Sequence, residues 1–128
     1  MIKNIHHINF VVHDINKAIH YFDHLLSQQA VTESLHQRKV KTALYTLGDT
    51  YLVIVQPTST EGVVAEILAN KGEGIFLLSF ETQSIEDLLS SLEIQYSQKR
   101  QGINDWSICD ISPYEKFGAI LQLTQVSK

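Results

Sequence analysis

Hydrophobic and polar positions along the chain follow the same order twice. Residues 5–19 read I-H-H-I-N-F-V-V-H-D-I-N-K-A-I, and residues 75–89 read I-F-L-L-S-F-E-T-Q-S-I-E-D-L-L. In each copy an apolar run typical of a buried strand leads to a polar residue suited to a helix N-cap, Asp14 or Ser84. Apolar residues at helical spacing then follow. The repeat therefore predicts a strand and a helix at the start of each half of the chain.

The rest of each half predicts further strands. In the first half, residues 31–35, 40–47 and 51–56 are strand-like, and a glycine-containing turn at 48–50 joins the last two into a hairpin. Pro57 ends the hairpin. The corresponding pieces of the second half are 94–97, 106–111 and 118–125. Each half thus has the order strand, helix, three strands.

This order predicts an α+β fold built from two βαβββ modules. We expect module one at about 1–57, a connecting helix within about 58–73, and module two at about 74–128. A half of this size buries too little apolar surface to be stable alone. We therefore expect the two modules to share one core, as a single domain over residues 1–128.

Composition narrows the class of protein. Of the 128 residues 44% are hydrophobic and 19% are charged, and the net charge is −4, so no basic patch favours nucleic acid. The N-terminus shows no apolar signal region, and no stretch predicts a membrane span. The single cysteine, Cys109, excludes an intrachain disulfide and suits a reducing cytoplasm. We expect a small cytoplasmic protein that binds neither nucleic acid nor membrane.

Strand alternation predicts a candidate site on the inner face of the sheet. His7 and Asn9 share one face of the first strand, while His6 falls on the opposite face, under a helix, as a core histidine. The repeat brings the equivalent residues of the second half and of the hairpin return strands to the same cavity. The residues expected to line it are His7, Asn9, Tyr51, Val53, Leu77, Ser79, Glu81, Gln122 and Thr124.

Three segments resemble one known superfamily. They are H-H-I-N-F-V-V-H-D, V-K-T-A-L-Y-T-L-G-D-T and P-T-S-T-E-G-V-V-A-E-I-L-A-N-K-G-E-G. They resemble the vicinal oxygen chelate superfamily, which includes glyoxalase I, extradiol dioxygenases, methylmalonyl-CoA epimerase and bleomycin-resistance proteins. The chain is most similar to the epimerase branch. The resemblance implies strongly curved mixed sheets around a cavity, helices on the outside, and a homodimer.

The same resemblance implies four metal-ligand positions, of which this chain keeps few. They fall on His7, Val53, Leu77 and Gln122, where the family typically has His, Gln or Glu, His, and Glu. Val53 and Leu77 offer no donor, and Gln122 is an amide where a carboxylate is usual. We therefore expect no metal ion. If one is held, His7 and Gln122 are its ligands, and Glu81 replaces a lost ligand only if its strand bulges.

Two functions from different classes remain open. The first is a binding protein that holds a small, partly apolar organic molecule in a metal-free cavity, and we prefer it. The second is an enzyme, either a metal-dependent epimerase or lyase, or a metal-free isomerase with His7 and Glu81 as candidate bases. An interaction subunit with a closed cavity is a third possibility. His20 and His24 have the i, i+4 spacing of a zinc site, but we interpret them as a solvated surface pair.

Overall fold

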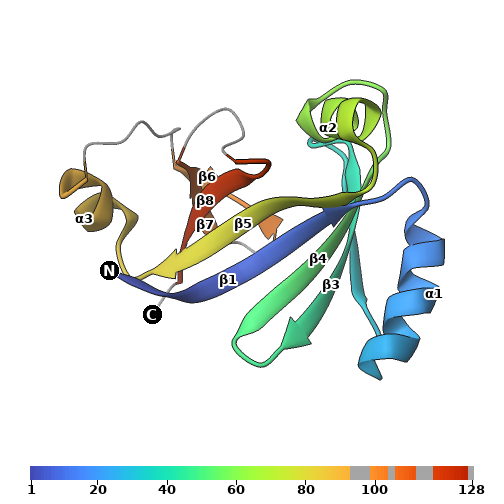
Figure 1. Cartoon of the computed structure of the whole chain (residues 1–128), viewed down its shortest axis with the longest axis horizontal. Coiled ribbons are helices and arrows are strands. Elements are labelled where there is room, and N and C mark those ends of the chain that lie inside the picture. Colours follow the sequence, from blue (N-terminus) through green and yellow to red (C-terminus); the bar gives the residue numbers. More distant parts are fainter. Residues whose placement is uncertain (93–98, 104–105, 112–116, 127–128) are drawn as a thin grey trace. The chain divides into compact units, whose positions relative to one another are not determined.

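The computed structural model describes residues 1–92, 99–103, 106–111 and 117–126. It confirms the strand–helix–three-strand order in both halves (Figure 1). The first half contains β1 (Ile2–Val11), α1 (Ile15–Leu26), β2 (Val31–Leu35), β3 (Val40–Leu47) and β4 (Thr50–Pro57), and α2 (Val63–Lys71) follows. The second half contains β5 (Gly74–Thr82), α3 (Ile85–Ser90), β6 (Arg100–Gln101), β7 (Ser107–Asp110) and β8 (Ile120–Gln125). The strand predicted at 94–97 lies outside the described residues.

The chain forms two compact units. Unit 1 consists of residues 1–8 and 77–128, and unit 2 consists of residues 9–76. Strands β1 and β5 each contribute residues to both units. No helix in the described part of the chain is long and apolar enough to cross a membrane.

In unit 2, strands lie in the order β2-β3-β4-β1, and β3 pairs antiparallel with both β2 and β4. The predicted turn between β3 and β4 is confirmed. Gly48 adopts a φ of 63°, a left-handed conformation that glycine tolerates without a steric penalty. Helix α1 packs on β3 and β4, where the Phe22 ring lies 5.8 Å from Phe10 and 6.1 Å from Tyr45 between ring centroids.

Helix α1 begins where the sequence predicts it. The Asp14 carboxylate accepts hydrogen bonds from the backbone N–H groups of Asn16 and Lys17. A residue from the sheet supplies a further acceptor, because Gln56 Oε1 on β4 accepts from Ile15 N at 2.8 Å. Local and long-range acceptors together satisfy the free N–H groups of the first turn.

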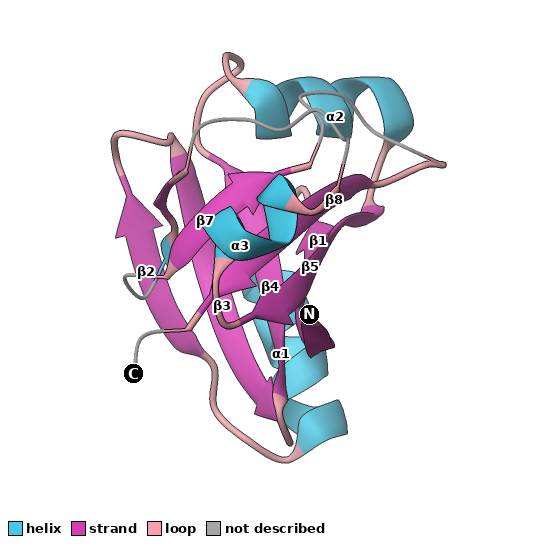
Figure 2. Ribbon diagram, turned by 90° about the vertical axis from the view of Figure 1, so that its left-hand side faces the viewer, coloured by secondary structure: helices cyan, strands magenta, loops and turns pink. Residues whose placement is uncertain are grey.

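In unit 1, strands lie in the order β1-β5-β8-β7-β6. Strands β5 and β8 are parallel, whereas β7 pairs antiparallel with β8 and with β6. One face of this sheet packs against α3, which lies in front of it in Figure 2. The buried cluster between them contains Ile85, Leu89, Cys109 and Leu123. Cys109 is 1% exposed, in keeping with its interpretation as a small buried hydrophobic residue.

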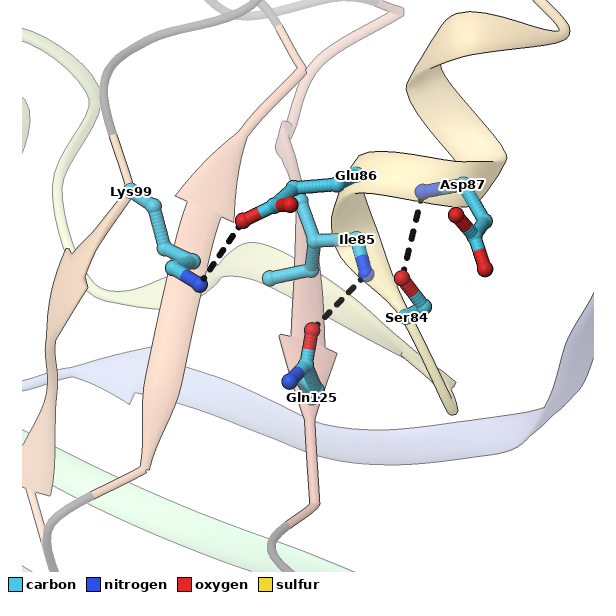
Figure 3. Close-up of polar contacts among 6 residues, drawn as sticks. All are labelled: Ser84, Ile85, Glu86, Asp87, Lys99 and Gln125. Carbon is cyan, nitrogen blue, oxygen red and sulfur yellow. Dashed lines mark hydrogen bonds and ion pairs between the residues drawn. The ribbon is translucent and has the colours of Figure 1, made fainter.

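Helix α3 repeats the start of α1. Ser84 Oγ accepts from Asp87 N at 3.1 Å, which confirms the predicted N-cap, and Gln125 Oε1 on β8 accepts from Ile85 N at 2.9 Å (Figure 3). Gln125 on β8 thus accepts from the first N–H of α3, as Gln56 on β4 does for α1. The duplication therefore includes this hydrogen bond between sheet and helix as well as the sequence pattern.

Candidate functional site

The candidate site lies on the face of the unit 1 sheet opposite α3. The strand register places Ser79 beside Gln122, and Gln122 beside Asp110. Because directly paired residues point to the same side of a sheet, these three side chains share a face. Leu77 and Glu81 alternate with Ser79 along β5 and join the same face. The apolar cluster under α3 comes from the intervening positions, such as Cys109 and Leu123 on the neighbouring strands.

Polar side chains on this face bond to one another. Ser79 Oγ and Thr124 Oγ1 form a hydrogen bond in which both residues are buried. Gln122, only 3% exposed, donates from Nε2 to Asp110 Oδ1 at 3.0 Å. The other Asp110 oxygen accepts from the Arg100 guanidinium at 3.1 Å. A row of three side chains therefore runs inward from the exposed arginine to the buried amide.

The Gln122 carbonyl oxygen is a buried acceptor without a hydrogen-bond partner in the described part of the structure. Asp110 explains its direction, because a carboxylate accepts hydrogen bonds and therefore selects the amide nitrogen. Leaving a buried acceptor unpaired costs about 1–3 kcal/mol. The face thus contains a buried oxygen that accepts no hydrogen bond of ordinary geometry from the described residues.

His6 and His7 form a buried pair beside this amide. Their Nδ1 atoms lie 2.9 Å apart, so one ring donates and the other accepts. Burial, followed by the neighbouring His6 ring, lowers the pKa of His7 to about 3. The Gln122 side chain opposes this shift, although no hydrogen bond of ordinary geometry reaches its carbonyl oxygen. Burial also lowers the pKa of His6, against the raising effect of the Glu81 carboxylate. Both imidazoles are consequently uncharged at neutral pH.

Trp106 joins the two histidines into an aromatic group. Its ring stacks on His7 with a centroid distance of 4.8 Å and an interplanar angle of 24°, and it meets His6 edge-on at 4.5 Å. Trp106 directly precedes β7 and is separated from Ile108 and Asp110 by even numbers of residues. Strand alternation therefore places it on the site face. We predicted that His6 lies under a helix. Instead its ring turns toward those of His7 and Trp106, so strict alternation does not hold at this point of β1.

The structure gathers one part of the predicted lining in unit 1. His7, Leu77, Ser79, Gln122 and Thr124 are all buried there, and Glu81 is half-buried. Asn9, Tyr51 and Val53 belong to unit 2, and their role in ligand binding stays a prediction. Sequence reasoning missed Asp110 as the residue that orients Gln122. The only signal for it was its position on a strand neighbouring β8.

The residues present do not fit the metal that the family resemblance implies. Leu77 and Val53, at two of the four ligand positions, are 7% and 1% exposed hydrophobic residues without a donor atom. Gln122 supplies one neutral oxygen, and His7 supplies one ring nitrogen, because its Nδ1 contacts His6. Among the described residues, no group of three or more His, Cys, Asp or Glu side chains could hold a metal ion. Divalent cations require more donors, and anionic ones in particular.

Solved structures with a similar fold include methylmalonyl-CoA epimerases. The epimerase of Mycobacterium tuberculosis matches with a TM-score of 0.87 and 20% identity, covering 99% of this chain and 90% of that one. A variant of the Streptomyces coelicolor epimerase in complex with 2-nitronate-propionyl-CoA matches with a TM-score of 0.86 and 20% identity over the whole of both chains. The hypothetical protein BH1468 of Bacillus halodurans C-125 gives 0.87 and 20%, covering 97% and 94%. At these identities the likeness establishes the fold.

Sequence comparison agrees with the fold. The uncharacterized protein YqjC of Bacillus subtilis (strain 168) is 26% identical over 129 residues, which cover 96% of this chain and 92% of that protein. The model of one protein family matches residues 6–109, which include the second copy of the repeat and all but the first residue of the first copy. The chain belongs to the glyoxalase/bleomycin resistance protein/dioxygenase superfamily.

Proposed function

We propose that this protein binds a small, partly apolar organic molecule, without a metal ion, on the site face of unit 1. The observation that carries the proposal is the buried Gln122 carbonyl oxygen, which Asp110 orients and which accepts no hydrogen bond of ordinary geometry from the described residues, although the Gln122 side chain interacts with His7. Buried acceptors in folded proteins are normally paired with protein, ligand or water. A ligand N–H or O–H would complete this one.

The aromatic neighbours support a ligand that is partly apolar. Trp106 and His7 stack with nearly parallel rings, and Leu77 contributes an aliphatic surface on the same face. Ligand sites typically combine such apolar surfaces with a few directed polar groups. The directed groups here are the Gln122 oxygen and the histidine pair.

Charge favours a neutral ligand. Buried His7 is uncharged at neutral pH because its pKa is about 3, and the Arg100 guanidinium is paired with Asp110. Asp110 and Glu81 are the acidic groups of this face. One solved relative is a methylmalonyl-CoA epimerase in complex with methylmalonyl-CoA and NH4⁺. A ligand carboxylate of that kind would find no unpaired positive charge among the described side chains of this face.

The alternative is a metal-dependent epimerase or lyase. It is supported by the fold, which this chain shares with the epimerases. The donor set opposes it, because Leu77 and Val53 provide no ligand atoms. A metal-free isomerase with His7 and Glu81 as bases stays a prediction, as do the homodimer and the cytoplasmic location.

Elemental analysis and native mass spectrometry of tag-free protein test the proposal. We expect the His7→Ala variant to contain as much metal as the parent, and the parent to carry an organic molecule. Gln122→Leu, which keeps the side-chain size and removes the oxygen, should lose that molecule. Gln83→Leu, at an exposed position, serves as the matched control.

Trp106, the only tryptophan, gives a second readout. Neutral compounds with a hydrogen-bond donor should change its fluorescence in the parent, but not in Gln122→Leu. One metal ion per chain that disappears in His7→Ala would overturn the proposal in favour of the metalloenzyme. No bound molecule together with no fluorescence response would favour the interaction subunit.

A further inference from the structure

The exposed surface of α1 carries two histidines one turn apart. His20 and His24 are both solvent-exposed, and their ring centroids lie 4.7 Å apart. Residues at i and i+4 lie on the same side of a helix, one above the other. The two imidazoles therefore face the same region of solvent.

A backbone contact fixes the tautomer of one ring. His24 Nδ1 lies 2.8 Å from the His20 carbonyl oxygen. A carbonyl oxygen only accepts, so Nδ1 carries the proton and donates it. The lone pair of the neutral ring is then on Nε2, which points away from the helix backbone. Metal-binding histidines commonly use this arrangement, in which the second ring nitrogen donates to a carbonyl and orients the ligand atom.

The surroundings of the pair form a shallow surface hollow of about 390 Å³, lined by His20, Tyr21, His24 and Leu25. Asp23, the nearest acidic residue of the same helix, is already engaged, because its Oδ1 accepts from Tyr45 Oη at 2.7 Å and from Ala30 N at 3.1 Å. The helix thus offers two imidazole nitrogens and no free carboxylate at this place.

The other histidines do not form such a site. The chain has six, all within the described residues. His6 and His7 are buried and bonded to each other, and His13 and His36 are exposed at separate positions on loops. His20 and His24 are therefore the only histidines of the chain that are exposed and also lie next to a second histidine.

We propose that His20 and His24 chelate one borderline divalent transition-metal ion, such as Ni²⁺, Cu²⁺ or Zn²⁺, through their Nε2 atoms. Imidazole suits these ions, whereas Mg²⁺ and Ca²⁺ prefer oxygen ligands. Water completes the coordination sphere. The pair lies on α1 in unit 2 and shares no residue with the ligand-binding face of unit 1.

Isothermal titration of tag-free protein with NiCl₂ tests the site. We expect one Ni²⁺ per chain, with the affinity reduced at least tenfold in both His20→Ala and His24→Ala. His36→Ala and His13→Ala are matched controls that remove one exposed histidine each, and they should bind Ni²⁺ as the parent does. MgCl₂ should give no heat of binding.

The variants are chosen so that folding does not obscure the result. Alanine is the best helix former, so either substitution on the exposed side of α1 leaves the helix intact, and thermal unfolding checks this. His7→Ala should leave Ni²⁺ binding unchanged, which separates this site from the buried pair. Equal Ni²⁺ affinity in the parent and in His20→Ala and His24→Ala would overturn the proposal. So would an equal loss in His36→Ala.

Discussion

Gln122 donates an Nε2–H to Asp110 Oδ1 at 3.0 Å, and Asp110 thereby fixes the direction of the buried amide. An amide can present either a donor or an acceptor, and a carboxylate neighbour removes that choice. At the position where the family resemblance implies a metal-binding carboxylate, this chain has an oriented neutral amide. The pairing therefore suits recognition of a hydrogen-bond donor better than coordination of a cation.

This pairing predicts different costs for its two neighbours. Asp110→Ala leaves the buried Gln122 nitrogen without its acceptor, so we expect the free energy of unfolding to fall by about 1–3 kcal/mol. Arg100→Ala removes a partly exposed ion pair and should cost less than about 1 kcal/mol. Urea unfolding at pH 7 measures both variants. A loss in Asp110→Ala no greater than that in Arg100→Ala would contradict the orienting role of the carboxylate.

The buried histidine pair predicts a loss of stability in acid. The pKa of His7 is about 3 in the folded protein and about 6.5 when unfolded, so between these values the unfolded chain binds the additional proton. Stability is complete above pH 6.5 and declines as the pH falls, by about 1.4 kcal/mol per pH unit for one such group. At pH 5 the cost is about 2 kcal/mol. The lowered pKa of His6 acts in the same direction.

Urea unfolding at pH 7 and at pH 5 checks this dependence. His7→Leu removes the titrating group, so the difference between the two pH values should become smaller than in the parent. His36→Gln, at an exposed position, should keep the parental difference. If His7→Leu and the parent lose the same free energy of unfolding between pH 7 and pH 5, His7 does not cause the pH dependence.

Local sequence patterns predicted most elements of this fold. The repeat located both β1–α1 and β5–α3, and Asp14 and Ser84 cap the helices as their positions indicated. These features depend on residues within one turn of one another. The two-residue strand β6 escaped prediction because its length leaves no periodicity to detect.

Contacts between distant residues account for what the sequence could not show. The sequence predicts Gln122 as an amide that lines the cavity, but the direction of that amide is set by Asp110, twelve positions earlier. His6 was assigned by alternation to the helix side, whereas the Trp106 ring and the His7 Nδ1 atom lie beside it. Tertiary contact decided both cases. The chemistry of the site therefore depends on partners that no local pattern identifies.

Restoring lost ligands should restore metal binding. The double variant Leu77→His and Gln122→Glu introduces, on β5 and β8, the two ligand types that the family resemblance implies at these positions, and His7 on β1 is retained. The new carboxylate faces Asp110, so without metal the variant should be less stable than the parent. A bound cation offsets this repulsion and stabilises the folded state by mass action.

Thermal unfolding with and without CoCl₂ measures the effect, in a His20→Ala and His24→Ala background that excludes the surface pair. We expect Co²⁺ to raise the Tm of the double variant and to leave that of the background protein unchanged. Adding His7→Ala should abolish the rise. A Co²⁺-dependent rise in the background protein itself would show that the native residues already suffice, and would contradict the metal-free interpretation.

The duplicated helix anchors predict matched effects in the two halves. Gln56→Leu and Gln125→Leu each remove the side-chain oxygen that accepts from the first backbone N–H of a helix, Ile15 N or Ile85 N. Each should lower the free energy of unfolding by about 1 kcal/mol, since the donor is left without its partner. Lys99→Ala removes only the exposed ion pair with Glu86 seen in Figure 3, and should cost well under about 1 kcal/mol.

Hydrogen exchange locates the change: protection should fall at the start of α1 in Gln56→Leu and at the start of α3 in Gln125→Leu. Unchanged protection at both helix starts would show that the glutamines do not anchor them.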